Sequence, residues 1–292
     1  MNLIKNHKIG LKIYQNIYLS NYSTIKIGGK ARFFAKPQNL EQFDFAIKFC
    51  NSHGLKPFIF GSGANILFSE KIKDDIFFIS LQNFNDFEID EEKIIVSAGF
   101  PVSLLPFSGL DDLYFLYLLP GTIGAATYMN VKYDRFELGS FISKILYIDL
   151  SDNEIREIEQ KDSQFSYKHS IFQEKNNWII LKIYFDKLKR DRFQLNNNIP
   201  YIEIEKFELN KLKFLLNRSR KKYSDLNKFY KFFSIKNIFN LLKYKKYLQS
   251  ELQNIIFQCF SLNDEILLKM KSIEEYRLSK NHFKYQSLGS IF

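Results

Sequence analysis

The pattern of apolar and polar residues between positions 25 and 100 predicts short strands and one helix. Apolar side chains recur three or four positions apart over residues 37–51, a spacing typical of an amphipathic helix. Pro37 near the start of this segment and Gly54 just past its end are common helix boundaries. We therefore expect a helix over residues 37–51, between an extended segment at 31–35 and a buried strand at 57–60.

Short apolar runs bounded by turn residues predict the remaining strands. These strands are expected at residues 76–79, 84–89, 94–98, 113–118, 142–150, 154–159 and 178–185. Ser151-Asp152-Asn153 separates two of the runs and predicts a hairpin, while Pro120 opens a short helix. Because helices do not alternate regularly with strands, the layout is α+β and not a doubly wound parallel sheet.

Residues 191–263 differ in character from the rest of the chain. They are polar and basic with a broad apolar stripe of helical spacing, and much of the formal net charge of +10 is concentrated over residues 206–246. A solvated helical face explains this pattern simply, and docking on nucleic acid or an acidic membrane surface is the alternative. We interpret the segment as a basic helical insertion, followed by a last helix at 265–278 and an extended end at 283–292.

Cysteine and histidine usage excludes several classes of site. Cys50 and Cys259 form no C-x-x-C pair and the four histidines are scattered, so neither a disulfide framework nor a metal site is predicted. The first 20 residues lack the pattern of a signal peptide, and no apolar stretch reaches the roughly 20 residues of a membrane span. We expect a cytoplasmic monomer whose main partner is not nucleic acid.

The run Gly61-Ser62-Gly63-Ala64-Asn65 directly follows the buried strand at 57–60. Glycines allow positive φ angles and close approach, so consecutive backbone N–H groups could surround a pyrophosphate. The run lacks both the third spaced glycine of the Rossmann pattern and the Gly-Lys-Ser/Thr end of the Walker pattern. Taken alone, such a run is more often an ordinary turn than a ligand site.

A second small-residue segment is Leu119-Pro120-Gly121-Thr122-Ile123-Gly124-Ala125-Ala126, followed by Met129-Asn130. Two glycines and a threonine hydroxyl at a helix start could support a flat or phosphorylated ligand. Close packing of a helix on a sheet would demand the same small residues. A third segment, Phe165-Ser166-Tyr167-Lys168-His169-Ser170, is predicted to be a polar loop before a strand.

Taken together and in order, these segments resemble the successive motifs of the UDP-N-acetylenolpyruvoylglucosamine reductases. The resemblance begins at Asn21-Tyr22-Ser23-Thr24 with Ile27-Gly28-Gly29 and continues through the Gly61 run, the Pro120 segment and residues 165–170. It ends with Arg277 and Tyr285-Gln286-Ser287-Leu288-Gly289-Ser290-Ile291-Phe292. Residues 20–188 and 264–292 are covered.

The resemblance implies a two-lobed α+β FAD-binding fold of the vanillyl-alcohol oxidase/para-cresol methylhydroxylase type. The expected domains are lobe 1 at residues 1–80, lobe 2 at 81–190, the helical insertion at 191–263 and the start of a substrate-binding domain at 264–292. FAD is expected to bind without a covalent link, because the glycine run offers no histidine. The implied cofactor-binding residues are Ile27, Gly28, Gly61, Ser62, Gly63, Ala64, Asn65, Ile66, Pro120, Gly121, Thr122, Gly124 and Ala125.

The reaction implied is reduction of UDP-N-acetylglucosamine enolpyruvate by NADPH through FAD, which forms UDP-N-acetylmuramate for peptidoglycan. Negative charge on the substrate carboxylate needs a fixed cation, and the adjacent carbon needs a proton donor. The resemblance assigns Lys168 to the cation, in place of the family's arginine, and Ser290 to the donor, with Tyr167 and Asn130 as substrate-binding residues.

The chain ends at Phe292, where the family's substrate-binding domain begins, and this leaves three alternatives for function. We expect a divergent reductase with impaired turnover. A reductase completed by a separate polypeptide or by the helical insertion is the second alternative. The third is a non-catalytic flavin- or nucleotide-binding module that docks through its basic segment.

Overall fold

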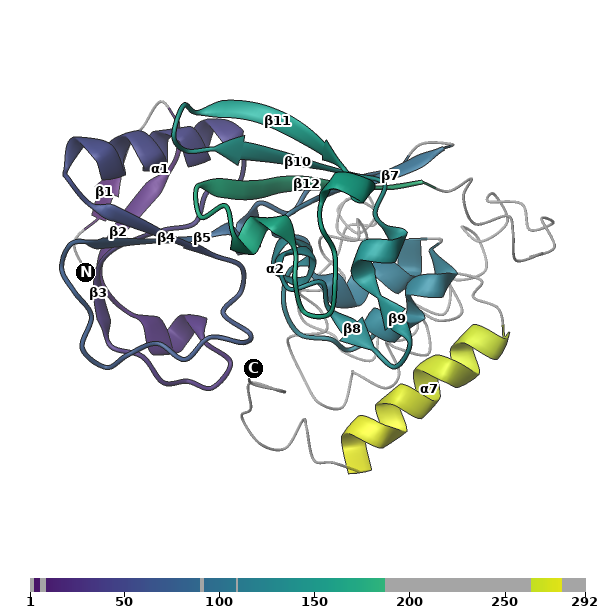
Figure 1. The fold of residues 1–292 in the computed structure, drawn as a ribbon. Helices are drawn as coiled ribbons and strands as arrows, with labels where there is room; N and C mark the ends of the chain where they lie inside the picture. Colours follow the sequence, from purple (N-terminus) through teal and green to yellow (C-terminus); the bar gives the residue numbers. More distant parts are fainter. Residues whose placement is uncertain (1–2, 6–8, 90–91, 109, 187–263, 280–292) are drawn as a thin grey trace, which may run out of the picture.

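Two five-stranded β-sheets make up most of the computed structural model, which describes residues 3–5, 9–89, 92–108, 110–186 and 264–279. The first sheet has the strand order β1 (Leu3–Lys5), β2 (Lys12–Tyr18), β3 (Lys30–Ala35), β5 (Ile76–Ser80) and β4 (Lys56–Phe60). Strands β1, β2 and β3 are antiparallel, whereas β5 runs parallel to both β3 and β4. Figure 1 shows helix α1 (Leu40–Ser52) beside this sheet.

Successive phenylalanines in β3 and β5 explain why the centre of this sheet is buried on both faces. Phe33 pairs with Phe77 and Phe34 with Phe78, and neighbouring side chains along a strand point to opposite faces. Phe33 and Phe77 belong to the main hydrophobic cluster, while Phe34 and Phe78 belong to a second cluster with Phe60 and Phe68. The apolar runs of β3 and β5 therefore mark strands that are covered on both faces. The expectation of a buried strand at 57–60 was wrong, because β4 is an edge strand in which Phe58 is 40 % exposed and only Phe60 is buried.

Helix α1 was expected from position 37 but begins at Leu40. The side chain of Asn39 accepts a hydrogen bond from the backbone N–H of Gln42 at 2.9 Å, so Asn39 is the N-cap. The expected apolar face is confirmed at Phe43, Ala46, Ile47 and Cys50, which are buried, whereas Leu40 at the start of the helix is exposed. Gly54 follows the helix with a φ of 61°, which glycine adopts without strain.

The second sheet is antiparallel throughout, with the order β11 (Glu154–Glu159), β10 (Lys144–Asp149), β12 (Trp178–Asp186), β7 (Lys93–Ser97) and β6 (Phe87–Ile89). The expected hairpin of β10 and β11 is confirmed. Two further short strands, β8 (Lys132–Tyr133) and β9 (Phe136–Glu137), pair with each other. The described 3-10 turns are η1 (Leu19–Tyr22), η2 (Leu81–Asn83), η3 (Val102–Ser108), η4 (Asp111–Leu116), η5 (Leu138–Phe141), η6 (Gln160–Asp162) and η7 (Ile171–Gln173).

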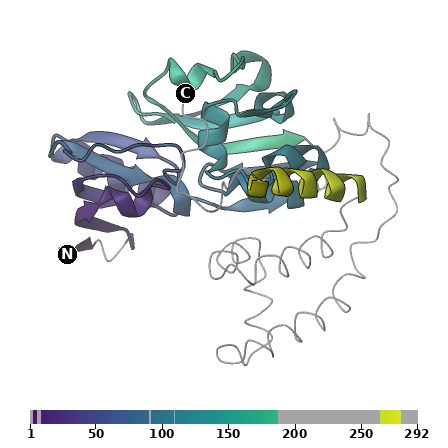
Figure 2. The same ribbon diagram turned by 90° about the horizontal axis from the view of Figure 1, so that it is seen from below.

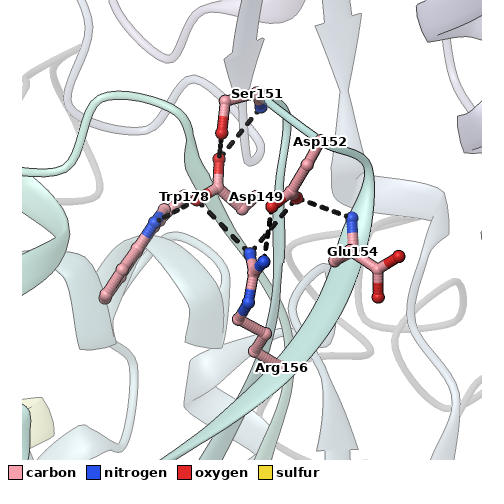
Figure 3. A network of polar contacts seen from close by, with 6 residues as sticks. All are labelled: Asp149, Ser151, Asp152, Glu154, Arg156 and Trp178. Atoms are coloured by element: carbon pink, nitrogen blue, oxygen red, sulfur yellow. Dashed lines mark hydrogen bonds and ion pairs between the residues drawn. The ribbon is translucent and has the colours of Figure 1, made fainter.

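A polar network closes the β10–β11 hairpin (Figure 3). The Asp149 carboxylate accepts hydrogen bonds from the Ser151 hydroxyl at 2.6 Å, the Ser151 N–H at 2.9 Å and Trp178 Nε1 at 2.8 Å. Arg156 bonds to Asp152 and lies 3.4 Å from Asp149 Oδ2. These bonds join the turn to β12 as well as to the hairpin.

Two of the strand predictions were wrong in whole or in part. Residues 113–118 were expected to be extended, but η4 occupies most of them. Leu113, Phe115 and Leu116 are all buried, so side chains of this run pack in several directions and not on the two faces of a strand. An apolar run alone does not distinguish a strand from a buried helical segment. Of residues 84–89, only Phe87–Ile89 form a strand, because Phe84 bonds through its N–H to Leu81 and through its carbonyl to Gly99.

Helix α2 (Ile123–Tyr128) packs on β7 and β12, and α7 (Asp264–Ser279) packs on η4. Figure 2 shows α7 lying along the edge of the second lobe. Met270 and Ile273 are its buried residues among those described, and one hydrophobic cluster includes Met270 together with residues of both sheets.

The predicted basic insertion and the extended end lie outside the described residues. Among the helices that are described, none is both long and apolar enough for a membrane span.

Candidate functional site

The two glycine-containing segments singled out in the sequence meet at the junction of the two sheets. The Gly61 run leaves the end of β4, and Pro120-Gly121-Thr122 lead into α2, which packs on β12 and β7 of the second sheet (Figure 1). A Cβ atom added to Gly61 would collide with the Thr122 hydroxyl, and one added to Gly121 would lie 3.8 Å from the Ala64 Cβ. Glycine at position 61 therefore lets Thr122 pack directly against its backbone, whereas Gly121 is favoured by its φ of 119° and not by crowding.

Contacts within lobe 1 fix the shape of the Gly61 run. The Ser80 hydroxyl donates to the Gly61 carbonyl at 2.6 Å, and the Thr24 N–H donates to the Gly63 carbonyl at 3.2 Å. Gly63 has a φ of 71°, and a Cβ atom there would collide with the Tyr22 carbonyl. Only glycine satisfies both constraints at position 63.

The segment around Ile27-Gly28 lies along the chain that follows the Gly61 run. Gly28 has a φ of 153°, and a Cβ atom added to it would lie 2.9 Å from the Phe68 Cβ. The Ser23 hydroxyl donates to the Ile66 carbonyl at 3.2 Å. Ile66 packs against the second hydrophobic cluster, whereas Ile27 is exposed. Gly28 and Ile66 therefore hold this part of lobe 1 together, and the Ile27 side chain remains accessible.

Thr122 carries the polar group that most clearly lacks a partner at this junction. Its side chain is 3 % exposed, and its hydroxyl makes no hydrogen bond in the structure. A threonine at an N-cap normally accepts from an amide of the first turn, but Thr122 makes no such bond. The Ile123 and Gly124 N–H groups instead donate to the carbonyls of Phe100 and Ala98, each at 2.8 Å. The hydroxyl packs directly against Gly61, since the oxygen is buried and a Cβ atom at position 61 would overlap it.

Gly124 and Ala125 have different surroundings from Gly121 and Thr122. A Cβ atom on Gly124 would lie 2.7 Å from the Ala98 Cβ, so this glycine permits close packing of α2 on the chain just after β7. The packing explanation raised from the sequence therefore applies to Gly124. Ala125 is exposed, and Pro120 is exposed before the helix starts.

Tyr167 and Lys168 occupy a tight turn that Ser166 and His169 close with reciprocal backbone hydrogen bonds at 3.1 and 3.2 Å. Tyr167 is 64 % exposed, and Lys168 is half-buried with a φ of 58°. Burial lowers the pKa of the Lys168 ammonium group. The turn therefore presents one open aromatic ring and one partly desolvated cation.

Asn130 lies next to this turn but differs from the expectation of a substrate contact. Its side chain is fully buried, and both the nitrogen and the oxygen of its amide bond to groups of the chain. Ser290, the expected proton donor, lies outside the described residues. Arg277, also noted in the resemblance, donates from Nη1 to the Leu118 carbonyl at 2.6 Å, just before the Pro120 segment.

Sequence reasoning missed Ser80 and Gln173, two residues that support the site. Ser80 ends β5 and pairs with Phe60 at the end of β4, so knowledge of strand pairing would have placed it beside Gly61. Gln173 donates to the carbonyls of Lys168 and Tyr128, each at 2.9 Å, and no local sequence signal marks this role. Within the described residues, no cluster of three or more His, Cys, Asp or Glu could hold a metal ion.

Comparisons with known proteins agree with this geometry. The family described as "FAD binding domain" matches residues 31–154, which include both glycine segments. UDP-N-acetylenolpyruvoylglucosamine reductase of Borreliella burgdorferi is 37% identical over 188 residues, covering 63% of this chain and 61% of that protein. The enzyme of the same name from Prochlorococcus marinus strain NATL2A is 30% identical over 202 residues, covering 65% of this chain and 68% of that protein.

Among solved structures, UDP-N-acetylenolpyruvylglucosamine reductase from Thermus caldophilus aligns with a TM-score of 0.48 at 17% identity, covering 59% of this chain and 61% of that one. The chain spans about 60% of the length of curated relatives that it matches, with shares of 61%, 57% and 59% in three of them. The sequence identity, the FAD-binding domain and the two-lobed α+β architecture lead to one conclusion: the chain belongs to the UDP-N-acetylenolpyruvoylglucosamine reductase family and has its FAD-binding fold, of the vanillyl-alcohol oxidase/para-cresol methylhydroxylase type.

Proposed function

We propose that this chain binds FAD non-covalently between its two glycine segments. The observation that carries the proposal is the direct contact between Gly61 and Thr122, which brings the two glycine segments together. The Thr122 hydroxyl at this contact is buried without a hydrogen bond, which costs about 1–3 kcal/mol, and we expect bound FAD to relieve that cost. The glycine surface opposite it suits close approach by a pyrophosphate.

The residues proposed to hold FAD lie in three segments. Gly61, Ser62, Gly63, Ala64 and Asn65 form one wall, and Pro120, Gly121 and Thr122 form the other. Ile27 lies exposed on the neighbouring segment that Gly28 and Ile66 fix in place. No residue from 61 to 66 is a histidine, which supports non-covalent binding. The domain boundary proposed near residue 80 places Ile27 and the Gly61 run in lobe 1, and Pro120, Gly121 and Thr122 in lobe 2.

The activity proposed is NADPH-driven reduction of UDP-N-acetylglucosamine enolpyruvate in peptidoglycan precursor synthesis. Bound FAD would supply hydride transfer between NADPH and the substrate. The Lys168 ammonium group would hold the substrate carboxylate, beside the exposed Tyr167 ring. Ser290 is the proposed proton donor. This assignment depends on family membership together with the placement of Tyr167 and Lys168 on one accessible turn.

Flavin binding is tested by titrating the purified protein with FAD and following flavin fluorescence. We expect saturable binding, with all flavin released into the supernatant when the protein is denatured. Gly61→Ala should weaken binding at least tenfold, because the added methyl group collides with the Thr122 hydroxyl. Gly54→Ala is the control for general loss of stability, since alanine there strains a backbone with a φ of 61° but collides with nothing within 4 Å, and Gly54 is outside the site. Protein that is colourless after incubation with excess FAD and removal of the free flavin would contradict the proposal.

Substrate assignment is tested separately on flavin-loaded protein. Addition of the enolpyruvyl nucleotide sugar should perturb the flavin absorbance spectrum, and NADPH oxidation should depend on that sugar. Lys168→Met should abolish the spectral response to the sugar while FAD affinity is retained. A flavin-loaded protein that shows no response to the sugar would exclude the substrate and leave flavin binding intact.

A further inference from the structure

The buried side chain of Asn130 links the end of α2 to the turn that carries Tyr167 and Lys168. Asn130 Nδ2 donates to the Ser166 carbonyl at 2.7 Å and to Glu137 Oε2 at 3.2 Å. Its Oδ1 accepts from the Gly139 N–H at 2.8 Å. Both N–H groups and the oxygen of the amide are therefore engaged within the chain, and the fully buried side chain has no polar group directed at a ligand.

The other side of the same turn is held by residues of η7 and its N-cap. The Ser170 hydroxyl donates to the Tyr128 carbonyl at 2.7 Å, and Gln173 Nε2 donates to the carbonyls of Tyr128 and Lys168, each at 2.9 Å. Tyr128 is the last residue of α2, so the bonds from both sides converge on the C-terminal end of this helix. The backbone on either side of Tyr167 and Lys168 is thus fixed by side chains that are not themselves on the open surface of the turn.

The Tyr167 ring is held by a chain of contacts that also begins at Asn130. Glu137 accepts from Asn130 through one carboxylate oxygen, and its other oxygen lies 3.1 Å from Lys132 Nζ. Lys132 Nζ in turn lies 5.5 Å from the centroid of the Tyr167 ring, within the range of a cation–π contact. A single buried amide therefore contacts the backbone of the turn directly and is linked to the Tyr167 ring through Glu137 and Lys132.

Helix α2 connects this turn to the proposed flavin site. Its N-cap is Thr122, and Asn130 lies two residues beyond its last residue. Six residues of α-helix extend about 9 Å, so the two ends of α2 are separated by roughly the length of a small ligand. A turn fixed to one end of the helix is fixed relative to whatever binds at the other end.

We propose that Asn130 is a positioning residue, which with Gln173 sets the place of Lys168 relative to the flavin site. The proposal rests on the proposed function and assigns to Asn130 a role different from direct substrate contact. An ammonium group on a flexible turn would meet the substrate carboxylate in many arrangements. A displacement of about 1 Å from the productive arrangement can cost on the order of 100-fold in rate.

The test compares two substitutions that release the turn in different ways. Asn130→Asp keeps the acceptor for the Gly139 N–H but removes both donors and places a carboxylate next to Glu137. Gln173→Ala removes the bonds to Lys168 and Tyr128 without burying a charge, so it remains informative if the first variant folds poorly. Ile145→Val, in the fully buried interior of β10 and away from the turn, is the control for general loss of stability.

Two measurements separate this inference from the proposed function. The first is hydrogen exchange of the backbone amides of residues 165–170 in the intact protein, which needs neither flavin nor substrate. The exchange rate should rise at least tenfold in both turn variants and stay unchanged in Ile145→Val. In flavin-loaded protein, the dissociation constant of the enolpyruvyl sugar should rise about tenfold or more in both variants, with FAD affinity unchanged. If the sugar does not bind wild-type protein, the function fails while the exchange result still stands.

A combined variant distinguishes positioning of the turn from a general structural role. In Asn130→Asp with Glu137→Gln, the new glutamine can donate to the new carboxylate, which restores the bond between positions 130 and 137 but not the bond to Ser166. We expect thermal stability to recover while fast exchange and weak sugar binding persist. Wild-type exchange and wild-type sugar affinity in Asn130→Asp and Gln173→Ala would overturn the inference.

Discussion

At the scale of single residues, the proposed site is defined by where glycine is required and where a polar atom lacks a partner. Gly61 and Gly63 cannot carry a Cβ atom without collision, and the reasons differ: Gly61 faces Thr122, whereas Gly63 faces the Tyr22 carbonyl. Gly124 shows the same crowding but faces Ala98, so it serves packing. Residue type alone does not separate these roles, since each depends on what lies opposite.

Thr122→Val should change the stability and the FAD affinity in opposite directions. Valine keeps the shape of threonine but removes the hydroxyl, so the flavin-free protein loses a buried group without a partner and should be as stable as wild type or more so. FAD affinity should fall by about 5- to 10-fold, equivalent to one lost hydrogen bond of roughly 1–1.5 kcal/mol. Thermal unfolding without flavin and fluorescence titration with flavin measure the two effects. A clear loss of stability in the flavin-free variant would show that the hydroxyl has a partner within the fold.

Lys168→Arg should flatten the alkaline side of the pH profile for substrate binding. Lysine holds a carboxylate only while protonated, and burial lowers the pKa of Lys168, so its charge is lost at a lower pH than that of an exposed lysine. A guanidinium group stays charged throughout the accessible range. Substrate affinity of the wild type, measured from the flavin spectrum over about pH 7–10, should therefore decline before that of the variant. Parallel profiles would remove Lys168 from the carboxylate contact.

At the scale of elements, local polar bonds determine where helices and hairpins begin and end. Asn39 sets the start of α1, three residues later than the proline suggested. The β10–β11 hairpin depends on side chains of its own turn and on Trp178 of β12 (Figure 3). Most of these bonds join residues that are close together in the sequence. The bond from Trp178 is the exception, and it connects the hairpin to β12.

Asp149→Asn should reduce the acid sensitivity of the second lobe. The hydroxyl and the N–H of Ser151 lower the pKa of Asp149, and the bond from Arg156 lowers the pKa of Asp152. A carboxyl group whose pKa is depressed in the fold stabilises the protein above its unfolded pKa of about 3.9, and this stabilisation disappears as the pH falls through the folded pKa. Urea midpoints between about pH 5 and 2 should thus fall less steeply in the variant than in the wild type. Asp162→Asn, at an exposed carboxylate outside the network, is the control.

At the scale of the whole molecule, one hydrophobic cluster joins the two lobes and α7. It contains Phe43 of α1, Ile183 of the second sheet and Met270 of α7, so the described elements share a core although they form two separate sheets. Helix α7 is also fixed by Arg277, whose guanidinium bonds to the Leu118 carbonyl close to the proposed flavin site. The position of the glycine segments relative to each other therefore depends on packing across the whole described fold.

Met270→Ala should lower the stability of both lobes together, because its side chain is fully buried in the shared cluster. Removing a buried methionine side chain typically costs about 2–5 kcal/mol. The fluorescence of Trp178, the only tryptophan, reports on the second lobe, and far-ultraviolet circular dichroism reports on the helices and strands together. The unfolding transitions followed by these two signals should coincide in the wild type and shift together in the variant. Leu268→Ala, at a side chain that is 66 % exposed on the same helix, should shift neither.

The sequence by itself determined most of the strands, helices α1 and α7, the hairpin turn and the order of the motifs. These features depend on local periodicity, on turn residues and on backbone preferences, which act over a few positions. The strand expected at 113–118 failed because a continuous apolar run is compatible with any buried conformation, and only packing against η3 and α7 selected the 3-10 turn. The late start of α1 likewise depended on which side chain captured the Gln42 amide.

Tertiary structure alone decided which of the singled-out residues face one another. The sequence could not show that Thr122 lies opposite Gly61 or that Gly124 packs on Ala98. Nor could it show that the side-chain amide of Asn130 forms hydrogen bonds with Ser166, Glu137 and Gly139. Each of these relations joins positions that are brought together by strand pairing and by the shared core. Small residues look alike in a sequence, because the requirement for a missing Cβ atom arises from the neighbour across the fold and not from the residues on either side.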